Sequence, residues 1–279
     1  MRCAVVGDPV GHSLSPVLHR AAYAALGLDW TYEAVRVASG TLPEVLAGLD
    51  DSWRGLSLTM PLKREVMALA VGARGEVTER ARLVGAANTL LVDEPRLRAD
   101  NTDLPGAVAA VRERWDGEVT RAVVLGGGAT AASTGLAACE LGAREVVVLA
   151  RTPERAAETV DAIRRHPGGV HVRVLPLTTP AEEVGPAELV VSTVPASAQT
   201  PDLVLRWAAT PVVFEVVYDP WPTPLAAAAA AADGTVLVAG LDLLVHQAAL
   251  QVEFMTGRPG PVDVMRAAGA AALAARAPA

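Results

Sequence analysis

The sequence predicts an α/β protein built from two domains, and three observations support this prediction. The chain has 279 residues, enough for two domains that each bury a hydrophobic core. Short apolar, β-branched runs alternate with helical segments, a pattern typical of parallel strands joined by helices. Near the middle, three consecutive glycines at 126–128 separate a strand-like run from a helical one. We therefore expect a mostly parallel sheet in the first half and a doubly wound parallel sheet in the second.

The composition excludes several classes of protein. Hydrophobic residues make up 51% of the chain, charged residues 20%, and the net charge is −7. This acidic balance argues against a nucleic-acid or membrane-surface binder, which would show a basic excess. The longest uncharged stretch, 122–139, is rich in small residues and does not predict a membrane span. Because no signal peptide is recognisable and two cysteines cannot build a disulfide framework or a metal cage, we expect a cytoplasmic protein without a metal.

Strands and helices alternate through the first hundred residues. The expected strands are 3–7, 30–37, 55–59 and 86–93, and the expected helices are 15–26, 41–50, 63–70 and 76–83. Ser15 followed by Pro16 predicts a helix N-cap with proline at the first helical position.

The second half continues the alternation. A helix is expected from Thr102 to Trp115, and a strand begins at Arg121. Further strands are expected at 145–150, 171–176, 188–193, 212–217 and 235–240. After Gly240 the pattern is helical to Thr256 and again from Pro261 to about Arg276.

The glycine turn has a dinucleotide-binding pattern. It matches G-x-G-x-x-A directly after a strand and before a helix, where glycines permit a tight turn and backbone N–H groups approach a pyrophosphate. The residues concerned are Gly126, Gly127, Gly128, Ala129 and Thr130.

The end of the next strand indicates which dinucleotide binds. An NAD site expects an acid there, whereas arginine accommodates the 2′-phosphate of NADP. Here Ala150 is followed by Arg151, Thr152 and then Arg155. Arginine binds phosphate with two parallel hydrogen bonds, so NADP(H) is the expected cofactor. Arg155 has an alternative interpretation as a solvated helix residue.

Lys63 is the single lysine among 24 basic residues. Arginine keeps its proton, whereas lysine changes its pKa readily on burial, so a lone lysine in an arginine-rich chain indicates proton transfer. The two asparagines, Asn88 and Asn101, and the acid Asp103 lie within forty residues of it. Polar side chains at predicted strand ends, among them Ser13, suit an anionic, hydroxylated small molecule.

These motifs resemble those of shikimate dehydrogenases. The matching segments occur in the same order as in that family: GHSLSP, SLTMPLK, TERARLVGAANT, DNTDLPG, GGGATAAS, ARTPERA, YDPWPTPL and GLDLLVHQAA. The resemblance runs from Val5 to about Gly257. It implies reversible, NADPH-dependent reduction of 3-dehydroshikimate to shikimate. It also implies a substrate domain of residues 1–103 plus 241–279, to which the C-terminal helices return, and a Rossmann-type NADP domain of residues 104–240.

The resemblance also assigns roles to residues of this sequence. Lys63 and Asp103 correspond to the catalytic pair. The substrate-binding positions are Ser13, Ser15, Thr59, Asn88, Tyr218 and Gln247. Besides the glycine turn and the segment Arg151, Thr152 and Arg155, the cofactor-lining positions are Glu79, Thr193, Val216 and Gly240.

The sequence departs from the family pattern at several positions. Ser57 and Ala150 stand where the family usually has asparagine, and Leu243 stands where methionine is common. Ala150 removes a polar group near the expected ribose phosphate. Two alternatives stay open at this point: a quinate or aminoshikimate dehydrogenase of the same family, and a non-catalytic NADP-binding sensor. The only partners expected are small molecules, and the chain is expected to be a monomer or a homodimer.

Overall fold

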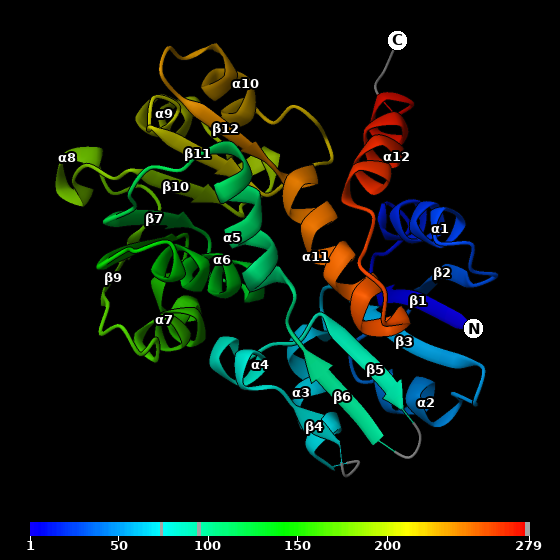
Figure 1. Ribbon diagram of the computed structural model, residues 1–279. Coiled ribbons are helices and arrows are strands. Elements are labelled where there is room, and N and C mark those ends of the chain that lie inside the picture. Colours follow the sequence, from blue (N-terminus) through cyan, green and yellow to red (C-terminus); the bar gives the residue numbers. More distant parts are fainter. Residues whose placement is uncertain (73–74, 94–95, 277–279) are drawn as a thin grey trace. The chain divides into compact units, whose positions relative to one another are not determined.

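The computed structural model describes residues 1–72, 75–93 and 96–276, and the chain forms two compact units. Unit 1 comprises Met1–Thr102 and Leu244–Ala279, and unit 2 comprises Asp103–Leu243 (Figure 1). The sequence placed Asp103 and residues 241–243 in the substrate domain, whereas here they belong to unit 2. Residues 277–279, at the end of the expected segment 241–279, lie outside the described residues.

Unit 1 contains a six-stranded sheet in the order β2-β1-β3-β5-β6-β4. Its strands are β1 (Arg2–Gly7), β2 (Thr31–Arg36), β3 (Trp53–Leu58), β4 (Glu76–Val77), β5 (Thr89–Asp93) and β6 (Arg96–Asp100). β5 runs antiparallel to β3 and β6, and the other pairings are parallel. Because β5 is reversed, its amino end lies at the same sheet edge as the carboxyl ends of β1, β3 and β6.

Helices cover both faces of this sheet. They are α1 (Ser15–Ala25), α2 (Leu42–Ala47), α3 (Leu62–Gly72), α4 (Glu79–Val84), α11 (Gly240–Thr256), which enters the unit at Leu244, and α12 (Val262–Ala274). Side chains of α2, α3 and α4, among them Leu42, Val66 and Ala81, pack on Leu56 and Leu90 in one core. Figure 1 shows α1 beside α12, a contact that ties the C-terminal segment to the first helix.

Three local predictions in unit 1 were wrong. The expected helix 76–83 begins as strand β4, because Thr78 is extended and its Oγ1 caps α4 by accepting a hydrogen bond from the Ala81 N–H. Strand β6 was not predicted, since its sequence RLRAD has little apolar character. Ser15 is the first residue of α1 and not its N-cap, and its side chain makes no capping bond. Instead, Ser13 Oγ accepts a hydrogen bond from the Ser15 N–H at 3.2 Å.

Unit 2 contains a parallel six-stranded sheet in the order β12-β11-β10-β7-β8-β9. Its strands are β7 (Arg121–Leu125), β8 (Glu145–Ala150), β9 (His171–Pro176), β10 (Leu189–Ser192), β11 (Val212–Glu215) and β12 (Val236–Ala239). The strand order reverses between β7 and β10, as the doubly wound prediction requires. Ligands of such sheets bind outside the carboxyl ends of the strands at this reversal.

Helices lie on both faces of the second sheet. They are α5 (Asp103–Arg114), α6 (Ala129–Glu140), α7 (Ala157–Arg164), α8 (Ala181–Val184), α9 (Pro201–Trp207) and α10 (Pro224–Ala231), with short 3₁₀ turns η1 (Pro153–Ala156) and η2 (Ala196–Ala198). Residues of α8, α9 and α10, including Leu203 and Leu225, share a buried core with Val123 and Val147. Helix α6 packs against α5 and α7. The apolar strands are therefore buried, as expected for a parallel sheet.

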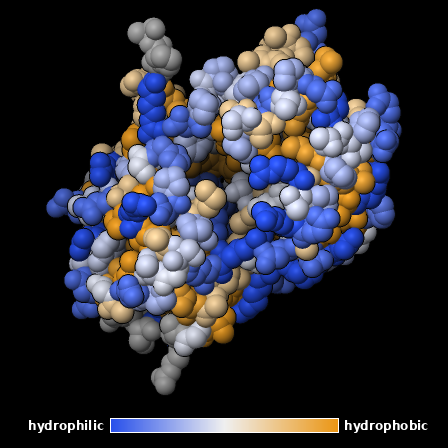
Figure 2. Space-filling view, turned by 180° about the vertical axis from the view of Figure 1, so that it is seen from behind, coloured by the Kyte–Doolittle hydropathy of each residue, from blue (hydrophilic) through white to orange (hydrophobic). Residues whose placement is uncertain are grey.

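Hydrophilic residues cover much of the face shown in Figure 2, with hydrophobic residues scattered among them. None of the helices in the described part of the chain combines the length and apolar character that a membrane span requires.

His19 makes the stability of unit 1 dependent on pH. Its ring stacks on Tyr32 with centroids 3.9 Å apart, and its Nδ1 donates to the Ser15 carbonyl at 2.9 Å. Nε2 has no hydrogen-bond partner among the described residues, and burial lowers the pKa of His19 to about 4. The unfolded chain takes up this proton near pH 6.5. The free energy of unfolding therefore falls as the pH drops from about 6.5 to about 4, by about 3 kcal/mol from this group.

Urea denaturation at pH 7, 5.5 and 4.5 measures this loss. His19→Gln should be less stable at pH 7 but show a flatter pH dependence, because it has no imidazole to protonate. His12→Gln is the control. Because His12 is exposed, its replacement should leave the pH dependence of the free energy of unfolding unchanged. If the free energy of unfolding falls equally with pH in the wild type and in His19→Gln, His19 is not the group that causes the loss.

Candidate active site

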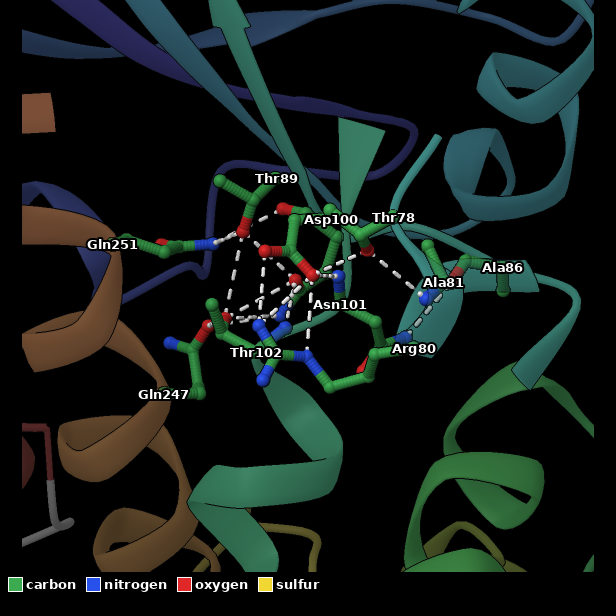
Figure 3. A network of polar contacts seen from close by, with 11 residues as sticks. Thr78, Arg80, Ala81, Ala86, Thr89, Asp100, Asn101, Thr102, Gln247 and Gln251 are labelled. Atoms are coloured by element: carbon green, nitrogen blue, oxygen red, sulfur yellow. Dashed lines mark hydrogen bonds and ion pairs between the residues drawn. The ribbon is translucent and has the colours of Figure 1, made fainter. Parts of the chain in front are cut away.

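Asn88 is buried and belongs to a polar network in unit 1, whose members Thr89, Thr102, Gln247 and Gln251 are labelled in Figure 3. Its carbonyl accepts the Leu58 N–H at 2.8 Å, and its own N–H donates to the Asp100 carbonyl at 3.1 Å. Its side-chain Oδ1 accepts the Thr102 N–H at 2.8 Å. Nδ2 donates to Thr102 Oγ1 at 2.9 Å and to Gln247 Oε1 at 3.1 Å. Since a backbone N–H can only donate, the Thr102 contact fixes which way the Asn88 amide points.

A chain of hydrogen bonds leads to Asn88 from the interior. Tyr32 donates to Ser57 Oγ at 2.6 Å, and Ser57 donates to Gln251 Oε1 at 2.7 Å. Gln251 Nε2 donates to Thr89 Oγ1 at 2.9 Å and to the Asn88 carbonyl at 3.0 Å. Thr89 then donates to Asn88 Oδ1 at 2.9 Å. A carbonyl can only accept, so the Gln251 amide has one possible orientation and every donor in the chain has a fixed direction.

A second cluster holds the segment that leads to Asp103. Arg80 contacts both carboxylate oxygens of Asp100, with Nη2 to Oδ2 at 2.9 Å and Nε to Oδ1 at 3.2 Å. Oδ1 also accepts from Thr78 Oγ1 at 2.8 Å and from the Asn101 N–H at 2.7 Å. Asn101 Nδ2 donates to the Ala86 carbonyl at 2.9 Å. Figure 3 shows these side chains converging below the end of β6, so the backbone that precedes Asp103 has a defined conformation.

Lys63 and Asp103 belong to different units. Lys63 is the second residue of α3 and is half-buried, and its carbonyl accepts the Ala87 N–H at 2.7 Å. Asp103 is the first residue of α5 and is 5% exposed. The segment Ala87–Asn88 thus binds the backbone of Lys63 directly and that of Thr102, the residue before Asp103, through the Asn88 side chain.

The other predicted substrate residues of unit 1 lie near the same sheet edge. Ser13 and Ser15 follow β1, and Thr59 follows β3. The Thr59 N–H donates to the Val6 carbonyl at 2.9 Å. Gln247 lies on α11 and reaches Asn88. Tyr218 does not share this unit, because it follows β11 in unit 2.

The glycine turn in unit 2 has a backbone that side chains would not fit at its first two positions. Gly126 has a φ of +121°, and a Cβ there would overlap Thr193 Oγ1. A Cβ at Gly127 would come within 2.7 Å of Ala156, whereas Gly128 has open space beside it. Helix α6 begins at Ala129 without a side-chain cap, so its first N–H groups are available to an anion.

Arg151, Thr152 and Arg155 surround the first turn after β8. Both arginines are exposed. The Arg155 N–H donates to the Thr152 carbonyl at 3.0 Å, which closes the turn. Thr193 and Val216 follow β10 and β11 at the same sheet edge, and Gly240 begins α11. Glu79 does not join this group, because it lies exposed at the start of α4 in unit 1.

Sequence reasoning missed several residues of the network. Thr89, Tyr32 and Gln251 received no role, and Ser57 was noted only as a departure from the family pattern. Gln251 follows Gln247 by four residues, so both lie on one face of α11. That spacing was the available signal.

Among the described residues, no group of histidine, cysteine or acidic side chains is arranged to hold a metal ion.

Two stretches of the chain match family descriptions. Residues 5–90 match the shikimate dehydrogenase substrate binding domain, and residues 240–268 match the shikimate 5′-dehydrogenase C-terminal domain. A protein of Synechocystis sp. named shikimate dehydrogenase (NADP(+)) is 34% identical over 276 residues, covering 95% of this chain and 93% of that protein.

Solved structures are similar over nearly the whole chain. The crystal structure of Mycobacterium tuberculosis shikimate dehydrogenase has a TM-score of 0.87 and 41% identity, and the match covers 97% of this chain and 99% of that one. The shikimate 5-dehydrogenase of Thermus thermophilus, solved in complex with NADP(H) and shikimate, has a TM-score of 0.84 and 32% identity, covering 98% and 100%.

The network predicts that replacing Gln251 lowers the free energy of unfolding more than replacing Tyr32 does. Gln251→Leu leaves Ser57, Thr89 and the Asn88 carbonyl short of partners, so the free energy of unfolding should fall by about 3 kcal/mol. Tyr32→Phe removes one donor and leaves Ser57 bonded to Gln251, so it should cost about 1 kcal/mol. Urea denaturation at pH 7 measures both, and equal losses would show that the chain does not act as described.

Proposed function

This chain belongs to the shikimate dehydrogenase family, and from that premise we propose which residues perform each part of the reaction. The enzyme reduces 3-dehydroshikimate reversibly to shikimate with NADPH, a step of aromatic amino-acid biosynthesis. We assign the substrate to unit 1 and the cofactor to unit 2. One observation supports the substrate assignment above all. The reversed strand β5 brings Asn88 to the sheet edge where β1, β3 and β6 end, next to the segments that hold Thr59 and Thr102.

The substrate residues divide by chemistry. Ser13 and Ser15 bind the carboxylate, because hydroxyl and N–H donors beside a helix N-terminus favour an anion. Thr59, Asn88 and Gln247 bind the ring hydroxyls, with Tyr218 contributing from unit 2. The protein contacts fix the orientation of the Asn88 amide, with Oδ1 toward the Thr102 N–H and Nδ2 toward Gln247.

The residues of unit 2 fit NADP(H). The positive φ of Gly126, the open space at Gly128 and the uncapped start of α6 suit a pyrophosphate, and Arg151, Thr152 and Arg155 suit the 2′-phosphate. The bound cofactor supplies the hydride that reaches the substrate carbon. Thr193, Val216 and Gly240 line the remainder of its path, with Glu79 assigned from unit 1.

Lys63 and Asp103 handle the proton. Reducing a ketone requires a proton on the oxygen as well as a hydride on the carbon, and the reverse reaction requires a base. Lys63 exchanges this proton with the substrate oxygen. Asp103 orients the Lys63 amine for this exchange.

The setting of the enzyme is also part of the proposal. We assign it to the cytoplasm as a monomer or homodimer. Cys3 and Cys139 are both buried, unpaired thiols, which suits a reducing compartment.

Replacing Lys63 tests the proton transfer. Lys63→Met should lower kcat by about 10²–10⁴-fold while shikimate still binds, because the proton has no donor. Lys63→Arg should be as inactive, since the guanidinium keeps the charge but does not release its proton. Steady-state kinetics and shikimate binding by calorimetry measure both variants.

The control for Lys63 is Arg64→Met, a neighbouring cation on α3 with no assigned role, which should retain kcat. Substantial activity in Lys63→Arg would assign the residue an electrostatic role in place of proton exchange.

A matrix of two substrates and two cofactors tests the overall assignment. We expect the highest kcat/KM for shikimate with NADP⁺, compared with quinate and NAD⁺. Arg151→Ser should reduce the preference for NADP⁺ over NAD⁺ by tenfold or more, because a charge-assisted contact to the 2′-phosphate is lost. Arg164→Ser, an exposed arginine on α7, is the control. Faster turnover of quinate would reassign the substrate, and no turnover of any pair would reject the proposal.

A further inference from the structure

Glu215 is a buried carboxylate in unit 2 with no role in the mechanism above. It is the last residue of β11 and is 0% exposed. Burial raises the pKa of Glu215 above its ordinary value. Removing a charge from water is unfavourable unless donors compensate for it, so the groups around this carboxylate define what it does.

Neutral donors from several segments converge on Glu215. Gln199 Nε2 donates to Oε2 at 2.6 Å, and Thr223 Oγ1 donates to Oε2 at 2.9 Å. The Val217 N–H donates to Oε1 at 3.0 Å, and the Ser192 hydroxyl also contacts the carboxylate. These donors come from the end of β10, from η2 and from the loop between β11 and α10.

The contact with Val217 determines the orientation of a particular peptide group. The N–H of Val217 and the carbonyl of Val216 belong to one planar trans peptide, so fixing the N–H also fixes the opposite direction of the carbonyl. On the other side, a Cβ at Gly240 would overlap the Val216 carbonyl oxygen. The Val216 N–H donates to the Ser192 carbonyl at 2.9 Å. The Glu215 contact therefore orients the Val216–Val217 peptide group, and the hydrogen bond to Ser192 fixes the preceding peptide group, between Glu215 and Val216.

The Val216–Val217 peptide follows β11, and this place in the sheet relates it to the nicotinamide half of the proposed cofactor. A dinucleotide crosses a doubly wound sheet at the strand reversal, with one nucleotide over each half. Arg151 and Arg155 follow β8 and mark the half that receives the adenosine 2′-phosphate. β10 and β11 lie on the other side of the reversal, so Thr193 and Val216 follow the strands over which the nicotinamide half of the proposed cofactor would lie.

We propose that Glu215 is a positioning residue for cofactor binding: it orients the Val216–Val217 peptide toward the nicotinamide half of NADP(H) and does not touch the cofactor itself. This inference rests on the proposed assignment of the cofactor to unit 2.

Replacement by glutamine tests the proposal with little change in size. In Glu215→Gln, one oxygen position becomes an NH₂ group, which faces either the donors of Gln199 and Thr223 or the Val217 N–H. Gln199 does not turn to relieve this conflict without loss, because its Oε1 accepts the Leu225 N–H at 2.9 Å. Two donors held at this distance repel, and the side chain and the attached peptide shift.

The matched control is Glu188→Gln. Glu188 also accepts three hydrogen bonds through one oxygen, from the N–H and hydroxyl of Thr120 and from the Arg121 N–H. It lies at the amino ends of β7 and β10, on the opposite edge of the same sheet.

Calorimetry on the full-length variants should compare NADP⁺ with adenosine 2′,5′-bisphosphate, which lacks the nicotinamide half. Glu215→Gln should weaken NADP⁺ binding at least tenfold and change bisphosphate binding less than twofold, with KM for NADP⁺ rising in parallel. Glu188→Gln should change neither. If Glu215→Gln does not fold, Ser192→Ala, which removes one donor to the carboxylate, takes its place. It should weaken NADP⁺ binding about threefold and leave bisphosphate binding nearly unchanged.

Equal weakening of both ligands would mean that Glu215 only stabilises unit 2 and would overturn the inference, as would unchanged binding of both. Failure of the wild-type protein to bind either ligand would instead reject the cofactor assignment on which the inference rests.

Discussion

The orientation of the Asn88 amide is the constraint on which the substrate side of this protein depends. Two backbone groups, the Thr102 N–H and the Asn88 carbonyl, leave no freedom in how the surrounding amides point. Ala87, the adjacent residue, binds the backbone of Lys63, and Thr102 precedes Asp103 in the chain. A shift of Asn88 would therefore reach the lysine and the start of α5 together. Small displacements of reacting groups are costly in catalysis, which explains why so many buried hydrogen bonds converge on one side chain.

Features with a local cause were predictable from the sequence, and features set by tertiary contacts were not. The glycine turn and the arginines after β8 follow from local geometry and charge, and both were placed correctly in the chain. The strand β6 has polar residues at alternate positions and becomes a strand because β5 supplies its hydrogen-bond partner. Ser15 has a favourable N-cap sequence, yet the helix begins at Ser15 itself, one residue earlier than a capping role requires, and Ser13 Oγ accepts a hydrogen bond from the Ser15 N–H.

The site shows the same division. Lys63, Asn88 and Asp103 were identifiable because their residue types are rare here or occur in recognisable motifs. Tyr32, Ser57 and Gln251 were not, since their importance comes from contacts between residues as many as 194 positions apart. These contacts show what the serine at position 57, where the family usually has asparagine, does in this chain. Ser57 accepts a hydrogen bond from Tyr32 and donates one to Gln251, which in turn binds the Asn88 carbonyl. In this chain, position 57 therefore helps to hold Asn88 in place.

Two buried carboxylates show how the protein meets the cost of burying charge in different ways. Asp100 pairs with the guanidinium of Arg80, whose positive charge compensates for the loss of water. Glu215 is surrounded by amide, hydroxyl and backbone donors that carry no net charge. Neutral donors stabilise an anion less than a cation does, but their directions are fixed by the elements to which they belong. A carboxylate held in this way is a poor source of stability and an effective means of fixing a loop, because each donor aligns one segment at the carboxyl edge of the sheet.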